Sequence, residues 1–197
     1  MAVTGIRGVV GSVARRAAQA NARRTARANR ARGGEDAIAL LIDDHTRIDQ
    51  LFARFPSIAG DGRQKAALVE RICDEIELHS RVEEEIFYPS VRALIAADAV
   101  MDEAAVEHDM ARVLVGQLRM LRPGDFHYDA KVAVLGAYVR HHFDREQRRI
   151  LPRARDCGID LAALGRALKA RKRQLKSSAT AAVISGMAGA TVNESAP

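Results

Sequence analysis

The sequence predicts an all-α protein: a four-helix up-and-down bundle with an internal two-helix repeat, a short extra C-terminal helix and a flexible basic N-terminal arm. Aromatic residues make up only 4% of the chain and Trp is absent, while helix-favouring Ala, Arg, Leu and Glu are abundant. Four segments carry apolar residues at helical spacing. The pattern His79, Glu83, Pro89 also recurs 63 residues later, which indicates a repeated helix pair.

Apolar periodicity predicts the helices in order along the chain. The four bundle helices are expected over residues 35–53, 63–96, 102–121 and 127–157. Pro89 lies inside the second of these and should bend it, because proline removes one backbone hydrogen bond. Gly158 should end the fourth. We expect a basic C-terminal helix within residues 158–176 and a flexible tail over residues 177–197, which are small and low in complexity.

The net charge of +6 is distributed unevenly. Residues 1–34 contain eight Arg and no acidic residue, residues 35–163 contain 17 basic and 24 acidic residues, and residues 164–197 contain six basic and one acidic residue. A segment as charged as residues 1–34 cannot bury enough apolar surface to offset its ordering entropy, so we expect a flexible arm. This arm is either a solvated tail or a segment that binds nucleic acid or an anionic surface.

Cysteine content and hydropathy bound the class of protein. The two cysteines, Cys73 and Cys157, are too few for a disulfide framework and favour a reduced, cytoplasmic protein. No run of 18 or more apolar residues occurs, so no transmembrane segment is expected. The Arg-rich start has no apolar core after it, which argues against a secretory signal, although transit peptides share its lack of acidic residues.

Four histidines, one in each predicted helix, fall on the apolar face of that helix. They are His45, His79, His108 and His142, and 34 residues separate the two members of each half. Glu83 and Glu146 each follow a histidine by four residues, which places imidazole and carboxylate on one face. A single histidine on such a face is most often a core residue. Two buried carboxylates without a cation would cost several kcal/mol, so the pattern predicts a metal site.

Each half of the predicted site offers two imidazoles and one carboxylate, the ligand types of non-haem iron chemistry. Helix bundles build such sites from side chains on facing helices. If both carboxylates bridge two six-coordinate ions, about eight of twelve ligand positions are filled, and solvent or an exogenous ligand can take the rest. Iron or manganese suits this nitrogen and oxygen set best, and residue type alone does not exclude zinc.

Several linked motifs resemble the hemerythrin-like cation-binding domain family over about residues 35–157. They are Asp44-His45, His79-xxx-Glu83-Glu84-Glu85-xx-Tyr88-Pro89, Glu107-His108, and His141-His142-xxx-Glu146 with Leu151-Pro152. The resemblance implies a four-helix bundle that holds two iron ions, with the four histidines as terminal ligands and the two glutamates as bridges. It also implies binding or turnover of a small oxidant (dioxygen, peroxide or nitric oxide), which includes a peroxide-removing, catalase-like activity.

One departure from the family pattern bears on this expectation. Oxygen-carrying hemerythrins have a further histidine one turn after the first histidine of the third helix, and this chain has Arg112 there. One imidazole fewer argues against reversible oxygen carriage. Asp49 and His141 are candidate replacement ligands, although Asp49 is better suited to accept a hydrogen bond from a ligand imidazole.

Two tyrosines lie close in sequence to predicted ligands. Tyr138 lies one turn before His142, so we expect its ring near the site, either as a catalytic phenol or as a core residue. Tyr88 is interpreted as structural. The alternative function is non-enzymatic: iron binding, or iron or oxygen sensing, in a protein that its basic arms attach to nucleic acid or an anionic surface.

Overall fold

The computed structural model describes residues 36–58, 61–95 and 98–190. Within these ranges helices are joined by short turns and loops and no strand occurs, as the sequence predicts. The Arg-rich arm over residues 1–34 lies outside the described residues, so what is expected of it stays a prediction. In the described ranges, no helix has both the length and the apolarity needed to cross a membrane.

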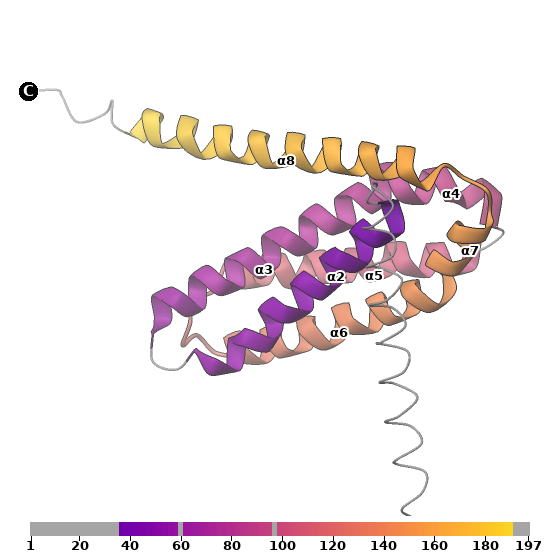
Figure 1. Ribbon diagram of the computed structural model, residues 1–197. Coiled ribbons are helices and arrows are strands. Elements are labelled where there is room, and N and C mark those ends of the chain that lie inside the picture. Colours follow the sequence, from indigo (N-terminus) through magenta and orange to yellow (C-terminus); the bar gives the residue numbers. More distant parts are fainter. Residues whose placement is uncertain (1–35, 59–60, 96–97, 191–197) are drawn as a thin grey trace, which may run out of the picture.

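Long helices lie side by side, and a further long helix crosses them (Figure 1). The elements are α2 (Ala37–Arg54), the 3-10 turn η1 (Phe55–Ser57), α3 (Gly62–Val82), the π-turn η2 (Glu83–Phe87), α4 (Tyr88–Ile95), α5 (Asp98–Arg119), α6 (Tyr128–Arg149), α7 (Leu151–Asp156) and α8 (Leu161–Ala190). Helix α2 contacts α3 and α6, and α5 contacts the same two helices. Helix α8 packs on α2, α3 and η2.

Aspartate side chains cap the first two long helices. Asp36 accepts a hydrogen bond from the backbone N–H of Ala39 at 2.7 Å. Asp61 accepts from the backbone N–H groups of Arg63 and Gln64 at 2.9 and 3.0 Å. Each cap satisfies donors that the first helical turn leaves unpaired. The caps therefore fix where α2 and α3 begin.

Proline interrupts the second and fourth predicted helices in different ways. Before Pro89 the chain forms a π-turn, in which the N–H of Tyr88 bonds to the carbonyl of Glu83 five residues back. The bend expected at Pro89 is therefore a change of helical register. In the fourth predicted helix, α6 ends and α7 begins just before Pro152, where the missing N–H of proline costs no intrahelical bond. The single helix predicted there is corrected to two.

The C-terminal helix is longer than the sequence indicated. The predicted short helix ends near residue 176, whereas α8 continues to Ala190, which corrects the helix end; residues 191–197 of the predicted tail lie outside the described residues, and its flexibility stays a prediction. Residues 179–190 contain several alanines, the strongest helix formers, and no proline. The low complexity of this segment led to the prediction of a tail, although its alanines allow the helix to continue. Helix α5 likewise begins at Asp98 rather than near residue 102.

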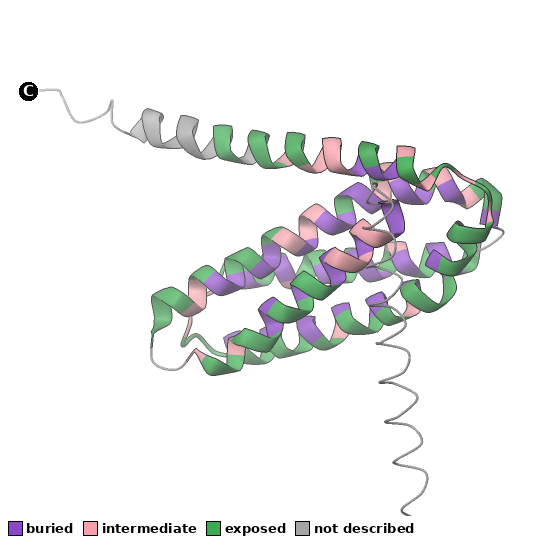
Figure 2. Cartoon of the chain, viewed as in Figure 1, coloured by how far each residue is buried: buried purple, intermediate pink, exposed green. Residues whose placement is uncertain are grey.

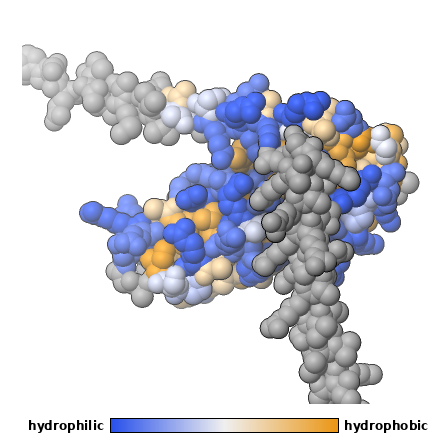
Figure 3. Space-filling view, viewed as in Figure 1, coloured by the Kyte–Doolittle hydropathy of each residue, from blue (hydrophilic) through white to orange (hydrophobic). Residues whose placement is uncertain are grey.

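Two apolar clusters fill the interior, and buried residues line the inward faces of the helices (Figure 2). Leu41 and Val82 belong to one cluster, and Ile48 and Ile76 belong to the other. His45 lies between Leu41 and Ile48 on α2, and the other three predicted ligand histidines also lie at the boundary of the clusters. Apolar packing on both sides keeps water from this polar layer. Hydrophilic residues cover much of the visible outer surface (Figure 3).

Gly136 of α6 lies against Phe52 of α2. A Cβ atom added at Gly136 would lie 2.9 Å from Cδ1 of that ring. We expect Gly136→Ala to lower the free energy of unfolding by about 1–3 kcal/mol, because the ring must move within a packed core. Gly116→Ala is the control: among the described residues nothing lies within 4 Å of its added Cβ, and alanine should raise stability by up to about 1 kcal/mol. Urea unfolding compares the two, and equal stabilities would contradict the close packing.

Candidate metal centre

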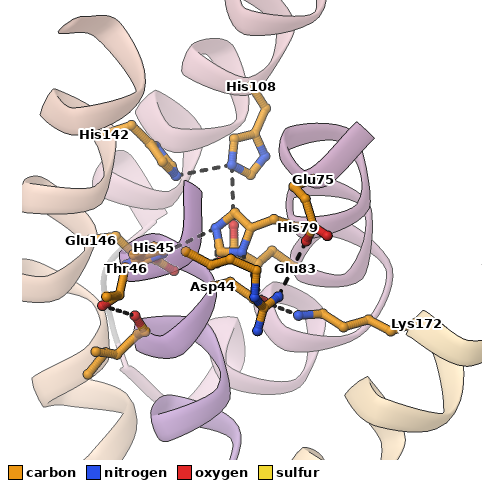
Figure 4. A network of polar contacts seen from close by, with 12 residues as sticks. Asp44, His45, Thr46, Glu75, His79, Glu83, His108, His142, Glu146 and Lys172 are labelled. Atoms are coloured by element: carbon orange, nitrogen blue, oxygen red, sulfur yellow. Dashed lines mark hydrogen bonds and ion pairs between the residues drawn. The ribbon is translucent and has the colours of Figure 1, made fainter. Parts of the chain in front are cut away.

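Four buried histidines from α2, α3, α5 and α6 turn their rings towards one another (Figure 4). The Nε2 atoms of His45 and His79 lie 3.1 Å apart. The Nε2 atoms of His108 and His142 are also 3.1 Å apart. Phe143 stacks on His45 with ring centroids 3.9 Å apart, which helps to fix the first pair. The helical faces predicted from the sequence thus converge on two imidazole pairs.

Two buried glutamates reach the same space. Glu83, in the π-turn, places Oε1 3.3 Å from Nε2 of His79 and Oε2 3.3 Å from Nε2 of His108. Glu146 places Oε2 3.1 Å from Nε2 of His45. Within the described ranges, two groups of side chains can hold a metal ion: a first position of His45, His79, Glu83 and Glu146, and a second position of Glu83, His108 and His142. Glu83 therefore joins the two positions.

The outer nitrogen of each imidazole has a polar partner. Three partners are carboxylates: Asp44 for His79 at 3.5 Å, Glu84 for His108 at 2.7 Å and Glu107 for His142 at 2.8 Å. A carboxylate accepts a hydrogen bond, so Nδ1 of these rings carries the proton and Nε2 presents a lone pair to the interior. The Nδ1 atom of His45 lies 2.9 Å from the side-chain amide of Gln147.

Hydrogen-bond acceptors line the space between the rings. Glu83 Oε1 and both carboxylate oxygens of Glu146 are buried without a hydrogen-bond partner among the described residues. Burial lowers the pKa of His45 and of His79 to about 4, so both rings are neutral near pH 7. Burial and the neighbouring Glu146 raise the pKa of Glu83 well above its usual range. Acceptors that face one another in an apolar interior are unfavourable unless a cation lies between them. The donor set therefore fits metal ions.

A match to a protein-family model identifies the family of this chain. Residues 36–154 match the model described as the hemerythrin HHE cation binding domain. The chain belongs to the hemerythrin HHE cation-binding domain family. This membership confirms the resemblance inferred from the motifs.

Among solved structures, the hemerythrin-like chain is similar to the crystal structure of a hemerythrin HHE cation binding domain-containing protein from Mycobacterium kansasii. The TM-score is 0.64 at 24% sequence identity, over 74% of this chain and 90% of that one. At this level of identity the likeness shows a shared fold. No protein with a curated description matches the sequence.

The hemerythrin-like fold brings the six predicted ligands together and leaves two further candidates outside. Asp49 is 55% exposed and forms an ion pair with Arg140 at 3.5 Å. His141 is 63% exposed, next in sequence to the buried His142. Neither side chain is directed at the interior, because each lies on the solvent side of its helix. Water solvates their polar groups there at no cost in burial.

Arg112, at the position where oxygen-carrying hemerythrins have a histidine, acts outside the two metal positions. Its guanidinium donates to the carboxylate oxygens of Glu84 at 2.8 and 3.1 Å, and Glu84 accepts the hydrogen bond from His108. A guanidinium has no acceptor atom and stays protonated, so it cannot be a ligand itself. Arg112 instead orients the carboxylate that accepts from the predicted ligand His108.

Tyr88, interpreted from the sequence as structural, contacts two of the predicted ligands. Its hydroxyl donates to Oε2 of Glu83 at 3.5 Å, and its ring stacks on His108 at 5.8 Å. In an α-helix a residue five positions later points about 140° away. The π-turn joins residues five apart and brings Tyr88 to the side of Glu83. In the sequence, Pro89, six residues after Glu83, is the feature that indicates an irregular helical turn here.

A narrow cavity adjoins the second position. The volume in which the centre of a water molecule can lie is about 10 Å³. The cavity therefore has room for about one water molecule. Tyr138 lines this cavity together with Glu107, His108 and His142. The cavity thus places Tyr138 beside the second position, and its catalytic role stays a prediction.

Proposed function

We propose that this hemerythrin-like protein holds two iron ions and binds or turns over a small oxidant: dioxygen, peroxide or nitric oxide. The observation that carries the proposal is Glu83, a buried carboxylate shared by two imidazole pairs. His45, His79 and Glu146 would complete the first position, and the other two histidines would complete the second. Mixed imidazole and carboxylate ligation suits iron, and the family resemblance favours iron over manganese or zinc. When bound, two iron ions supply the electrons that reduce an oxidant.

The surrounding residues would select the oxidant by size and hold it near the second position. The cavity beside His108 and His142 admits one water-sized molecule, which suits a diatomic gas or peroxide and excludes larger substrates. Tyr138 lines this cavity and can donate a hydrogen bond to a molecule inside it. Tyr88 already donates to Glu83 and so holds the shared carboxylate in place.

The contacts also support a four-helix, two-repeat architecture. In the first half, Asp44 accepts from a histidine 35 residues later, and in the second half Glu107 does the same. The residue after each predicted bridging glutamate, Glu84 or Gln147, contacts the outer nitrogen of a histidine in the opposite half. Contacts that recur at a fixed offset are expected when a helix pair is duplicated.

Iron sensing without turnover is the second candidate function. Buried carboxylate oxygens that lack partners, on Glu83 and Glu146, make the folded state depend on a bound cation. Metal binding to the folded state alone would raise stability through mass action. Occupancy of the site would then report the iron supply through the stability of the domain.

Elemental analysis and peroxide consumption test the proposal together. The protein purified from iron-supplemented cells is expected to carry two iron ions per chain and to consume peroxide. His79→Ala should lose iron from the first position and the peroxide activity with it. His127→Asn, which changes an exposed histidine at a positive φ of 66° that asparagine tolerates, is the control and should retain both. Iron without peroxide consumption would favour sensing, whereas iron bound equally well by His79→Ala would contradict the site.

A further inference from the structure

Helix α8 docks on the bundle through basic side chains that meet acidic ones. Arg171 donates to both carboxylate oxygens of Glu85 in the π-turn, at 2.5 and 3.1 Å. Lys172 forms a close ion pair with Asp44 of α2 (Figure 4). Buried Leu164 adds an apolar contact. This helix lies beyond residues 36–154, the part of the chain that matches the family model.

Lys172 is connected to the first metal position through one intervening side chain. Its ammonium group donates to Oδ2 of Asp44, and the same oxygen lies 3.5 Å from Nδ1 of His79. The Lys172 side chain is only 16% exposed and that of Asp44 is buried, so water screens this ion pair weakly. A charge on α8 thus faces the acceptor that sets the tautomer of a predicted ligand.

In the second half of the bundle, the carboxylate equivalent to Asp44 pairs with a cation from a bundle helix. Glu107 lies 63 residues after Asp44 and has the same role towards His142. Its counter-charge is Arg145 of α6, whose Nη1 donates to Oε1 at 2.7 Å. The position 63 residues before Arg145 is Val82, a buried apolar residue without charge. The first half therefore has no cation at the position equivalent to Arg145, and α8 provides one.

Arg47 offers Asp44 another cation, but a weaker one. It donates to Oδ1 of Asp44 at 3.0 Å and to Glu75 at 3.3 Å. Its side chain is 43% exposed, so solvent screens the interaction. The shielded partner of the oxygen that faces His79 is Lys172.

We propose that Lys172 is a positioning residue for the first metal position, and that α8 is part of the metal centre rather than an appendage of it. The inference rests on the proposed function. Lys172 holds the Asp44 carboxylate directed at Nδ1 of His79, which keeps the imidazole in the tautomer that presents Nε2 to the metal. Loss of such an outer partner typically weakens metal binding by 10–100-fold. The effect should be confined to the first position.

Iron release from the loaded, full-length protein tests this inference. Under reducing conditions, with a coloured Fe(II) chelator in excess, Lys172→Met should release one of its two ions about tenfold faster than the wild type, and the other at the wild-type rate. Lys176→Met is the matched control. It removes a neighbouring charge on α8 whose side chain is 60% exposed and lies 3.6 Å from Glu75, and its release should be unchanged. Lys172→Arg, which restores the charge, should recover most of the slow phase.

Arg145→Met provides the mirror experiment. It should accelerate release of one ion, that of the second position, so the variant that carries both Arg145→Met and Lys172→Met should release both ions quickly. A double variant that keeps one slow ion would show that both residues act on the same position, which overturns the inference. Equal acceleration of both ions in Lys172→Met, or none, would overturn it too. A wild type without two ions would refute the proposed function instead.

Discussion

Glu83→Gln is expected to empty both metal positions, whereas Glu146→Gln is expected to weaken the first position alone. Glu83 belongs to both groups of metal-holding side chains, and Glu146 belongs to the first. An amide carries no negative charge, so each position that shares Glu83 loses a charged ligand. Iron per chain should fall close to zero in Glu83→Gln and to about half of the wild-type content in Glu146→Gln.

The same substitution should have the opposite effect on the metal-free protein. The neutral amide of glutamine can donate to Nε2 of His79 or His108 without taking up a proton, whereas the wild-type carboxyl group, whose pKa is raised, must either bind a proton or remain a buried charge. A buried carboxylate that lacks a counter-charge also disappears. Metal-free Glu83→Gln should therefore unfold with a free energy about 1–3 kcal/mol higher than the metal-free wild type in urea.

A surface substitution separates this effect from a general loss of charge. Glu70 is 55% exposed and pairs with Arg119, so Glu70→Gln should keep both iron ions and change stability by less than about 0.5 kcal/mol. If Glu83→Gln kept both ions, or were less stable than the wild type when both are metal-free, the shared position of Glu83 would be refuted.

The convergence of the ligands could be predicted from the sequence because it depends on spacing within each helix. His79 and Glu83 are four residues apart, and His142 and Glu146 repeat the pattern. Residues at that spacing share a helical face. Packing of the apolar faces against one another turns these side chains towards the interior.

The outer partners could not be predicted in this way because they depend on how helices pack. Asp44 directly precedes His45 in the sequence, yet it bonds to His79 of the neighbouring helix. Glu84 lies in a run of three glutamates and bonds to His108. Neither pairing follows from the periodicity of one helix, since both partners must first be placed by tertiary contacts.

Contacts made by the π-turn η2 and by α8 also could not be predicted from the sequence. Tyr88 reaches Glu83 only because the helix changes register before Pro89, and a regular α-helical projection places Tyr88 on another face. Lys172 lies 128 residues from Asp44. The sequence around Lys172 shows a basic helix, and nothing in that local pattern indicates a buried partner.

Metal-free Glu83→Gln should lose stability as the pH falls from about 6.5 to about 4. Burial lowers the pKa of His45 and of His79 from 6.5 to about 4. In this window the unfolded chain binds protons at both imidazoles and the folded chain does not. Proton binding therefore stabilises the unfolded state and lowers the free energy of unfolding. The stability contribution is complete above pH 6.5 and is lost towards pH 4. His45 and His79 together give a slope of at most about 2.7 kcal/mol per pH unit, and His108, whose pKa burial also lowers, adds to it.

The Glu83→Gln background isolates the histidines. In the wild type the raised pKa of Glu83 would act in the opposite direction, because the folded state then holds a proton that the unfolded state releases. Urea unfolding at a series of pH values gives the slope directly. A further His79→Leu change should remove the contribution of that imidazole, at most about 1.4 kcal/mol per pH unit.

His127→Asn is the matched control for this slope. His127 is exposed and adopts a positive φ of 66°, a conformation that asparagine tolerates, so the change should leave the slope unaltered. Stability that stays constant between pH 6.5 and pH 4 would mean that His45 and His79 take up protons in the folded protein as readily as in the unfolded chain. Their rings would then be accessible to solvent, and the dry, acceptor-lined interior on which metal binding depends would not exist.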